Sequence, residues 1–171
     1  MAKAVFLDRD GTIIRDKNFL SSPDGIEILP GVPEALRRLK EKGFMLILIT
    51  NQSGVGRGFF SSETVDEIHT RLQVILEDAA PDAIYVCPHH PDDGCKCRKP
   101  ATRLFEEAIK KYSIDPRRSF AVGDKPSDVE AGRRIGCKTV FLGESSGCSS
   151  ADHCAADFPS AVDWILSHSE A

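Results

Sequence analysis

Five short, nearly uninterrupted apolar runs recur along the chain, and amphipathic segments lie between them. The runs do not alternate with polar residues, which favours strands that are covered on both faces in a parallel sheet. They span residues 4–7, 44–49, 83–86, 119–122 and 138–142. Strands and helices in strict alternation predict an α/β fold with a doubly wound, mostly parallel, Rossmann-like sheet.

The segments between the runs carry apolar residues three and four positions apart, which predicts helices. Pro33 near the start and Gly43 past the end frame the first helix, and serines of the capping type begin the second. The predicted helices span residues 33–42, 61–78, 100–112, 126–135 and 159–167. His69 and His168 are expected on helix surfaces, and Trp164 is expected to cover the core.

The chain shows no internal repeat and no convincing linker. We therefore expect residues 1–171 to form one domain, without a separate cap domain. The stretch 143–159, rich in Ser, Gly and Ala, is the candidate for a mobile loop.

Polar side chains follow the apolar runs at the points where the predicted strands end. Asp8 and Asp10 come directly after the first run, and the later runs lead into Thr50, Cys87 and Asp124. In an extended segment residues i and i+2 point to one side, roughly 6–7 Å apart. The two acids can therefore address one phosphate or one divalent metal. Because strand ends share one edge of an open α/β sheet, the sequence predicts a site there.

A second cluster of chemistry-bearing residues crowds the loop after the third run. It comprises Cys87, His89, His90, Cys95 and Cys97. Three thiolates and one imidazole make a closed tetrahedral set for Zn²⁺, which predicts a structural role. The zinc would hold the loop that carries Arg98 and Lys99. His90 is the competing imidazole.

The cysteine pattern indicates metal ligation by reduced thiols and not a disulfide framework. Cys148, His153 and Cys154 are spaced too loosely, in a flexible stretch, to predict a second metal site.

Composition narrows the class of protein. The chain has 171 residues, 41% hydrophobic and 28% charged, with a net charge of -4. These values are ordinary for a soluble globular protein, and no excess positive charge exists to attract nucleic acid or an anionic membrane. No apolar run is long enough to span a bilayer or to form a signal-peptide core. We expect a soluble, cytoplasmic protein.

Four motifs together resemble those of the haloacid dehalogenase-like (HAD) phosphohydrolases. They occupy residues 8–12, 50–54, 97–100 and 123–128. With the zinc loop and the stretch from Asn51 to Phe60, the chain more narrowly resembles the D-glycero-D-manno-heptose 1,7-bisphosphate 7-phosphatases. The likeness runs from about residue 4 to residue 142.

The resemblance implies an aspartyl-phosphate mechanism. Asp8 would attack phosphorus, and Asp10 would protonate the leaving oxygen and later activate water. Mg²⁺ would be held by Asp8, the backbone carbonyl of Asp10 and Asp124, with Asp128 supporting the site. A carboxylate near a phosphate dianion is repelled by on the order of 4 kcal/mol at an effective dielectric near 20, so cations are required.

The resemblance also implies a set of substrate-binding residues and a small phosphorylated sugar as substrate. Lys99 would add positive charge and Thr50 a hydrogen bond at the transferring group. The set comprises Asp16, Thr50, Asn51, Gln52, Ser53, Arg57, Arg98 and Lys99. The segment around Asp16 departs from the family, with Ile14 at a position where asparagine is common and Lys17-Asn18-Phe19 in place of a Gly-Tyr ending.

Three alternatives stay open. Histidinol-phosphate phosphatases share the zinc set and a five-residue spacer like the one between His89 and Cys95. Polynucleotide 3′-phosphatases are further relatives, but the chain lacks a basic stripe with interleaved aromatics. A catalytically silent zinc-binding scaffold is the alternative from another class. We expect a monomer that contacts neither nucleic acid nor membrane.

Overall fold

A six-stranded, wholly parallel sheet forms the centre of the molecule. The computed structural model describes residues 1–144 and 148–169. The strand order is β3-β2-β1-β4-β5-β6, and every neighbouring pair is parallel. The strands are β1 (Lys3–Leu7), β2 (Phe44–Asn51), β3 (Ala83–Cys87), β4 (Phe120–Gly123), β5 (Lys138–Leu142) and β6 (His153–Ala155). The predicted fold class is confirmed.

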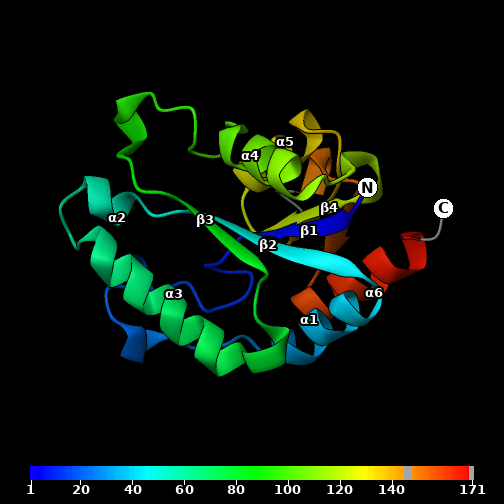
Figure 1. The fold of residues 1–171 in the computed structure, drawn as a ribbon, viewed down its shortest axis with the longest axis horizontal. Helices are drawn as coiled ribbons and strands as arrows, with labels where there is room; N and C mark the ends of the chain where they lie inside the picture. The colour runs from blue at the N-terminus through cyan, green and yellow to red at the C-terminus, as the bar shows by residue number, and fades with distance from the viewer. Residues whose placement is uncertain (145–147, 170–171) are drawn as a thin grey trace.

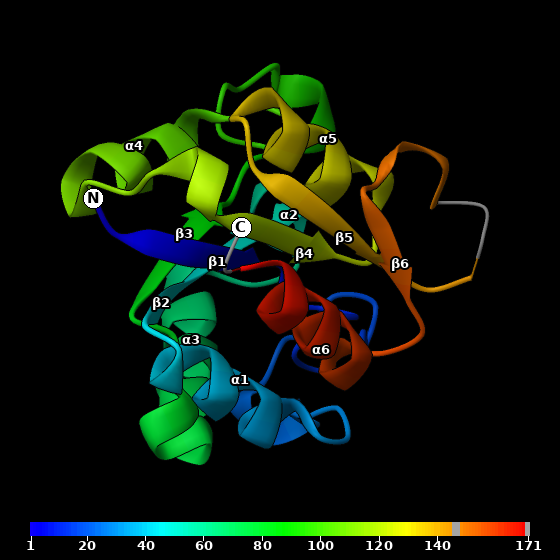
Figure 2. The same cartoon turned by 90° about the vertical axis from the view of Figure 1, so that its right-hand side faces the viewer.

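Helices cover both faces of the sheet. In Figures 1 and 2, α1, α3 and α6 lie on one face, and α4 and α5 lie on the other. The α-helices are α1 (Val32–Glu41), α2 (Ser53–Gly56), α3 (Ser62–Leu76), α4 (Arg103–Tyr112), α5 (Pro126–Arg134) and α6 (Phe158–His168). Short 3₁₀ helices occupy Pro23–Gly25, Glu77–Ala79, Pro91–Asp93, Pro116–Arg118 and Cys148–Ser150. Across the described ranges, no helix combines the length and apolar character that crossing a bilayer requires.

Successive residues of β1 serve the two opposite cores, which explains the lack of alternation in the sequence. Val5 and Leu7 belong to the cluster under α1, α3 and α6, while Ala4 and Phe6 belong to the cluster under α4 and α5. Side chains alternate across a strand, so a strand buried on both faces must be apolar throughout.

The carboxyl ends of the strands carry the segments that matter for the site. After β1, residues 14–28 form a loop that is closed by a β-bridge between Ile14 and Ile28. We call this loop the flap. Ile14, at the position where the resemblance led us to note a departure, is fully buried in the core. After β2 comes the short α2, and after β3 comes the cysteine-rich loop.

Two features of the 143–159 stretch were not predicted from the sequence. Residues 153–155 form the edge strand β6, which is held by Asp152: its Oδ2 accepts from Thr139 N at 2.7 Å and from Thr139 Oγ1 at 2.9 Å. Cys148 and Cys154 form a disulfide, so the expectation of reduced thiols was wrong for this pair. Part of the predicted mobile loop, residues 145–147, lies outside the described residues.

Helix α5 packs unusually closely on the sheet because Gly132 has no side chain. A Cβ at this position would lie 2.5 Å from Ala121 Cβ and 2.8 Å from Thr139 Cγ2. We predict that Gly132→Ala lowers the free energy of unfolding by about 1–3 kcal/mol, because overpacking displaces the helix. Glu130→Ala on the exposed side of α5 is the control, with an expected change within about 0.5 kcal/mol in urea titration. Equal stability of the two variants would contradict the close packing.

Candidate active site

Three acids meet at the carboxyl edge of β1 and β4. One carboxylate oxygen from each of Asp8, Asp124 and Asp128 lies within 4.8 Å of the others. Burial, with the charge of Asp8 added, raises the pKa of Asp124 to about 7 and that of Asp128 to about 6. Like charges held together disfavour the ionised form, so this cluster requires positive charge.

Lys99 supplies one positive charge from within the protein. Its Nζ lies 2.8 Å from Asp8 Oδ1, 2.7 Å from Asp128 Oδ1 and 2.6 Å from the carbonyl oxygen of Ile49. Burial works against the ionisation of both partners, but the ion pair raises the pKa of Lys99 and lowers that of Asp8. All three ammonium hydrogens have protein acceptors, so Lys99 primarily fixes the carboxylate of Asp8.

The acid cluster fits a divalent cation through Asp124. Its Oδ1 is buried and has no hydrogen-bond partner among the described residues. Asp128 is committed elsewhere, since Oδ1 contacts Lys99 and Oδ2 accepts from the Lys125 amide at 3.1 Å. Few oxygen ligands, completed by water or phosphate, are typical of Mg²⁺ sites. Asp8 and Asp124 thus have the free oxygens for such an ion, and Asp128 supports them.

Gly11 permits this arrangement. Its φ of +82° lies in the left-handed region, and a Cβ there would come within 2.1 Å of Asp124 Oδ2. Any side chain at this position would displace Asp124 from the cluster.

Asp10 is held by donors on its inner side. Arg9 Nε donates to Asp10 Oδ2 and Arg9 Nη2 donates to Oδ1, each at 3.1 Å, and Gln52 Nε2 donates to Oδ2 at 2.9 Å. Arg9 is fully buried, and its Nη1 lies 3.0 Å from Nε2 of His69. His69 is 6% exposed, so the prediction that it lies on the helix surface was wrong. Arg9 was not among the predicted site residues.

A cavity of about 360 Å³ opens beside Asp8 and Asp10. Arg57 and Arg98 line it, and Arg98 Nη1 is buried without a hydrogen-bond partner among the described residues. Phe19 at the tip of the flap packs edge-on against Phe59, with ring centroids 5.0 Å apart. The remaining lining residues are Asp16, Asn18, Leu20, Asn51, Gln52, Ser53, Lys99, Lys125, Ser127 and Asp128.

Several predicted substrate-binding residues also have partners within the protein. Asn51 Oδ1 accepts from the Lys99 amide at 3.0 Å, and Asn51 Nδ2 donates to the Lys99 carbonyl at 3.3 Å, so Asn51 fixes the backbone of Lys99. Thr50 is buried and is not among the residues that line the cavity, and its hydroxyl accepts from Gln52 Nε2 at 2.8 Å. Ser53 Oγ accepts from Arg57 Nε at 3.4 Å.

The cavity wall also includes residues that sequence reasoning missed. Lys125 Nζ lies 3.8 Å from Asp16 Oδ2, which places the exposed flap acid over the cavity. Lys125 directly follows Asp124 in the same motif, so its position in the sequence could have predicted that it lies at the site. Asn18 and Leu20 come from the flap, where no motif pointed to them.

The four predicted zinc ligands converge in the loop after β3. Sγ of Cys97 lies 3.1 Å from Cys87 Sγ, 3.6 Å from Cys95 Sγ and 3.1 Å from His89 Nδ1. Two thiolates on one tetrahedral Zn²⁺ lie about 3.8 Å apart, so the spacing suits this ion. The competing His90 faces elsewhere, since its Nδ1 accepts from the Asp92 amide at 3.1 Å.

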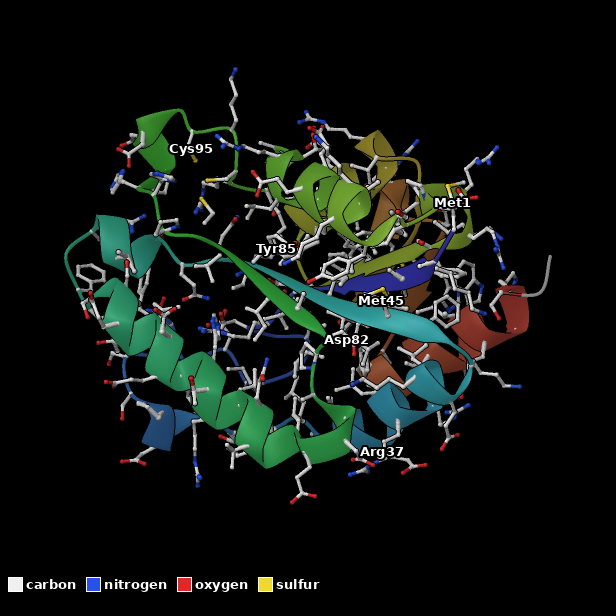
Figure 3. The ribbon with its side chains drawn as sticks, in the orientation of Figure 1. Met1, Arg37, Met45, Asp82, Tyr85 and Cys95 are labelled. Atoms are coloured by element: carbon white, nitrogen blue, oxygen red, sulfur yellow. A yellow bond between two sulfur atoms is a disulfide. The ribbon has the colours of Figure 1, made fainter. Side chains whose placement is uncertain are left out.

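The zinc loop packs directly against α2, on the side of the molecule away from the N-terminus (Figure 1). Figure 3 shows Cys95 at the outer end of this loop. Gly56 brings α2 close: its amide donates to the Pro88 carbonyl at 2.8 Å, and a Cβ would lie 2.3 Å from the His90 amide nitrogen. Since Arg98 and Lys99 follow Cys97 directly, ordering of this loop positions both cations.

Comparison with known proteins gives one consistent class. The family profile described as polynucleotide kinase 3 phosphatase matches residues 3–166. A crystal structure of D,D-heptose 1,7-bisphosphate phosphatase from B. bronchiseptica, complexed with magnesium and phosphate, superposes with a TM-score of 0.87 at 33% identity over 99% of each chain. The fold and the acid cluster define a phosphatase of the HAD-like class.

Sequence relatives identify the family within that class. The D-glycero-β-D-manno-heptose-1,7-bisphosphate 7-phosphatase of Haemophilus ducreyi is 41% identical over 149 residues, covering 82% of each chain. The Yersinia pestis enzyme of the same name is 37% identical over 172 residues, covering 95% of this chain and 89% of its own. The chain belongs to the D-glycero-D-manno-heptose-1,7-bisphosphate 7-phosphatase family.

The choice of His89 over His90 as the zinc ligand is tested by replacing each histidine in turn. We predict that His89→Gln loses the bound zinc and melts at a lower temperature, because the loop loses its cross-link. His90→Gln is the matched control and keeps about one zinc ion per chain, measured by atomic emission. Full zinc content in His89→Gln, or its loss in His90→Gln, would reverse the assignment.

The raised pKa of Asp124 predicts how stability responds to pH. Without divalent metal, the folded protein keeps the Asp124 proton up to about pH 7, whereas the unfolded chain releases it near the ordinary value of 3.8. The unfolded state therefore binds fewer protons between these values, and stability falls as pH rises through this window. Mg²⁺ should raise the melting temperature strongly at pH 8 and little at pH 5.

Asp124→Asn is the control for this behaviour. The amide cannot ionise, so the pH-dependent loss and the Mg²⁺ response should both shrink in thermal melts. An unchanged Mg²⁺ response in this variant would show that the ion binds elsewhere.

Proposed function

We propose that this protein is a Mg²⁺-dependent phosphomonoesterase that removes the 7-phosphate of D-glycero-D-manno-heptose 1,7-bisphosphate. Two lines of support converge. Two family members that are 41% and 43% identical to this chain carry that activity in their names. The cavity holds paired acids, a cluster of oxygens for a divalent ion and two arginines that have no carboxylate partner among the described ion pairs.

Asp8 is the nucleophile in this proposal. Lys99 holds its Oδ1 at 2.8 Å and keeps the carboxylate ionised. The Asp8 carboxylate attacks phosphorus and forms an aspartyl-phosphate as the sugar oxygen leaves, and water then hydrolyses this intermediate. When bound by Asp8, the Asp10 carbonyl and Asp124, Mg²⁺ supplies positive charge that offsets repulsion between carboxylate and phosphate.

Asp10 is the general acid, and then the general base, in this proposal. Its Oδ2 accepts from Arg9 and Gln52, while its Oδ1 accepts from Arg9 alone among the described residues. Each carboxylate oxygen has two lone-pair sites. Oδ1 is therefore the atom with capacity to carry the proton to the leaving sugar oxygen and to take one from water.

The observation that carries the choice of substrate is the buried, unpartnered Nη1 of Arg98 at the cavity. A buried guanidinium nitrogen without an acceptor is costly, which favours an anionic ligand part. Arg57, exposed on the same cavity wall, adds a second cation. A bisphosphate offers one phosphate to Asp8 and another to these arginines.

Histidinol phosphate is the alternative substrate, and it fits this wall less well. Its ammonium group would approach Arg57 and Arg98, and like charges repel. The flap acid Asp16, which could balance that charge, lies near Lys125 instead. The silent-scaffold alternative offers no reason for the buried Asp8–Lys99–Asp128 ion pairs. A nucleic-acid substrate, as in the name of the matching family profile, receives no support from the net charge of -4.

We further propose that residues 1–171 act as one monomeric domain in the cytoplasm. The two described core clusters share a single sheet, which supports one folding unit. The four cysteines outside the Cys148–Cys154 disulfide are free thiols, and three of them belong to the zinc cluster, which favours a reducing compartment.

Arg98→Met tests the assignment of the second phosphate. We expect KM for the bisphosphate to rise about 10- to 100-fold, because a charge-assisted contact is lost, with little change for the 7-monophosphate. Arg103→Met, on the exposed start of α4, is the matched control and should leave both values unchanged. Asp8→Asn gives the background rate.

The outcomes separate the candidate functions. Equal losses on bisphosphate and monophosphate would contradict the proposed role of Arg98. Faster wild-type turnover of histidinol phosphate would favour the alternative substrate, and a rate no higher than that of Asp8→Asn on every phosphoester would favour the scaffold.

A further inference from the structure

His69, on the buried side of α3, belongs to a chain of hydrogen bonds that ends at Asp10. Its Nε2 lies 3.0 Å from Arg9 Nη1, and Arg9 grips Asp10 through Nε and Nη2. His69 comes from α3, whereas Arg9 and Asp10 follow β1. Sixty positions of sequence thus separate His69 from the side chain that it contacts.

The chain of hydrogen bonds defines the tautomer of His69. The Arg9 guanidinium has donors and no acceptor, so Nε2 of His69 must accept, and the ring proton lies on Nδ1. Burial and the charge of Arg9 also lower the pKa of His69 to about 3, which keeps the ring neutral. A neutral acceptor is what this position requires, because a second cation would repel Arg9.

The orientation of Arg9 depends on this acceptor. Arg9 is fully buried, and its side chain faces the inner side of Asp10. Nη1 is the edge of the guanidinium group that Asp10 does not occupy, and His69 holds that edge. Loss of the acceptor would leave a buried donor without a partner, and the planar fork would turn away from Asp10 to regain one.

We propose that His69 is a positioning residue for the reaction: acting through Arg9, it holds the Asp10 carboxylate so that Oδ1 faces the leaving group. The inference rests on the proposed phosphatase chemistry but not on the identity of the sugar. The proposal predicts that loss of His69 lowers the rate most for substrates whose leaving group must be protonated by a general acid. Esters with poor alkoxide leaving groups need protonation, whereas aryl phosphates with good leaving groups need it little.

The test is the dependence of kcat on leaving-group pKa, measured with Mg²⁺ over a series of alkyl and aryl phosphate monoesters. In His69→Leu we expect kcat to fall about tenfold for alkyl esters and less than about threefold for aryl esters. His69→Gln, whose carbonyl can accept from Arg9, should recover most of the alkyl rate. Gln73→Leu, one turn further along α3, is the control and should match the wild type.

Equal losses across the series, or no recovery in His69→Gln, would overturn the proposal and leave His69 a merely structural residue. If His69→Leu folds poorly, the wild-type protein alone still tests the hydrogen bond between His69 and Arg9. ¹⁵N NMR should report a neutral His69 ring with its proton on Nδ1 at pH 6. A protonated ring, or a proton on Nε2, would refute the hydrogen bond and with it the proposal. If the proposed function is wrong, the wild-type protein will instead prefer a different phosphate ester. The leaving-group test of His69 remains valid in that case.

Discussion

The ammonium group of Lys99, buried between Asp8 and Asp128, is the interaction on which the rest of the site depends. Three acids converge there, and removing one partner from a buried ion pair typically costs about 3–5 kcal/mol. The surroundings fix Lys99 from several directions. Asn51 binds its backbone, the zinc loop ends two residues before it, and the Ile49 carbonyl accepts from Nζ. The cysteine-rich loop and Asp8 are therefore connected through one side chain.

The fold was predictable because burial on both faces imposes continuous apolar runs, which the four inner strands β2, β1, β4 and β5 carry and the edge strand β3 shares. The last strand, β6, was missed because its three residues, His153–Ala155, are too few to form a recognisable apolar run and its support comes from a hydrogen bond between Asp152 and Thr139. Helix α4 begins later than the predicted position 100, at Arg103, because Pro100 to Thr102 form the turn that leaves the zinc loop. Such local hydrogen bonding has no periodic signature.

Site residues were predictable where they lie close together in the sequence at a characteristic spacing. They were less predictable where helices and strands far apart in the sequence meet in the fold. The Cys-x-His and Cys-x-Cys pattern identified the zinc cluster that the structure brings together. His69 lies three or four residues from Val65 and Leu72, which is the core-facing spacing, and its polarity obscured that signal. Its contact with Arg9 depends on how α3 crosses the sheet, which sequence spacing does not encode. The roles of these residues in catalysis stay predictions.

The central claim is that Asp8 and Asp124 bind one divalent ion opposite Lys99. Crystals soaked in Mn²⁺ test it most directly, because anomalous scattering locates manganese independently of the phases and distinguishes it from zinc by wavelength. The account predicts a manganese peak within ligand distance of Asp8 and Asp124, and a separate zinc peak among Cys87, His89, Cys95 and Cys97. Full manganese occupancy at another site, with Asp124 turned away from Asp8, would contradict it.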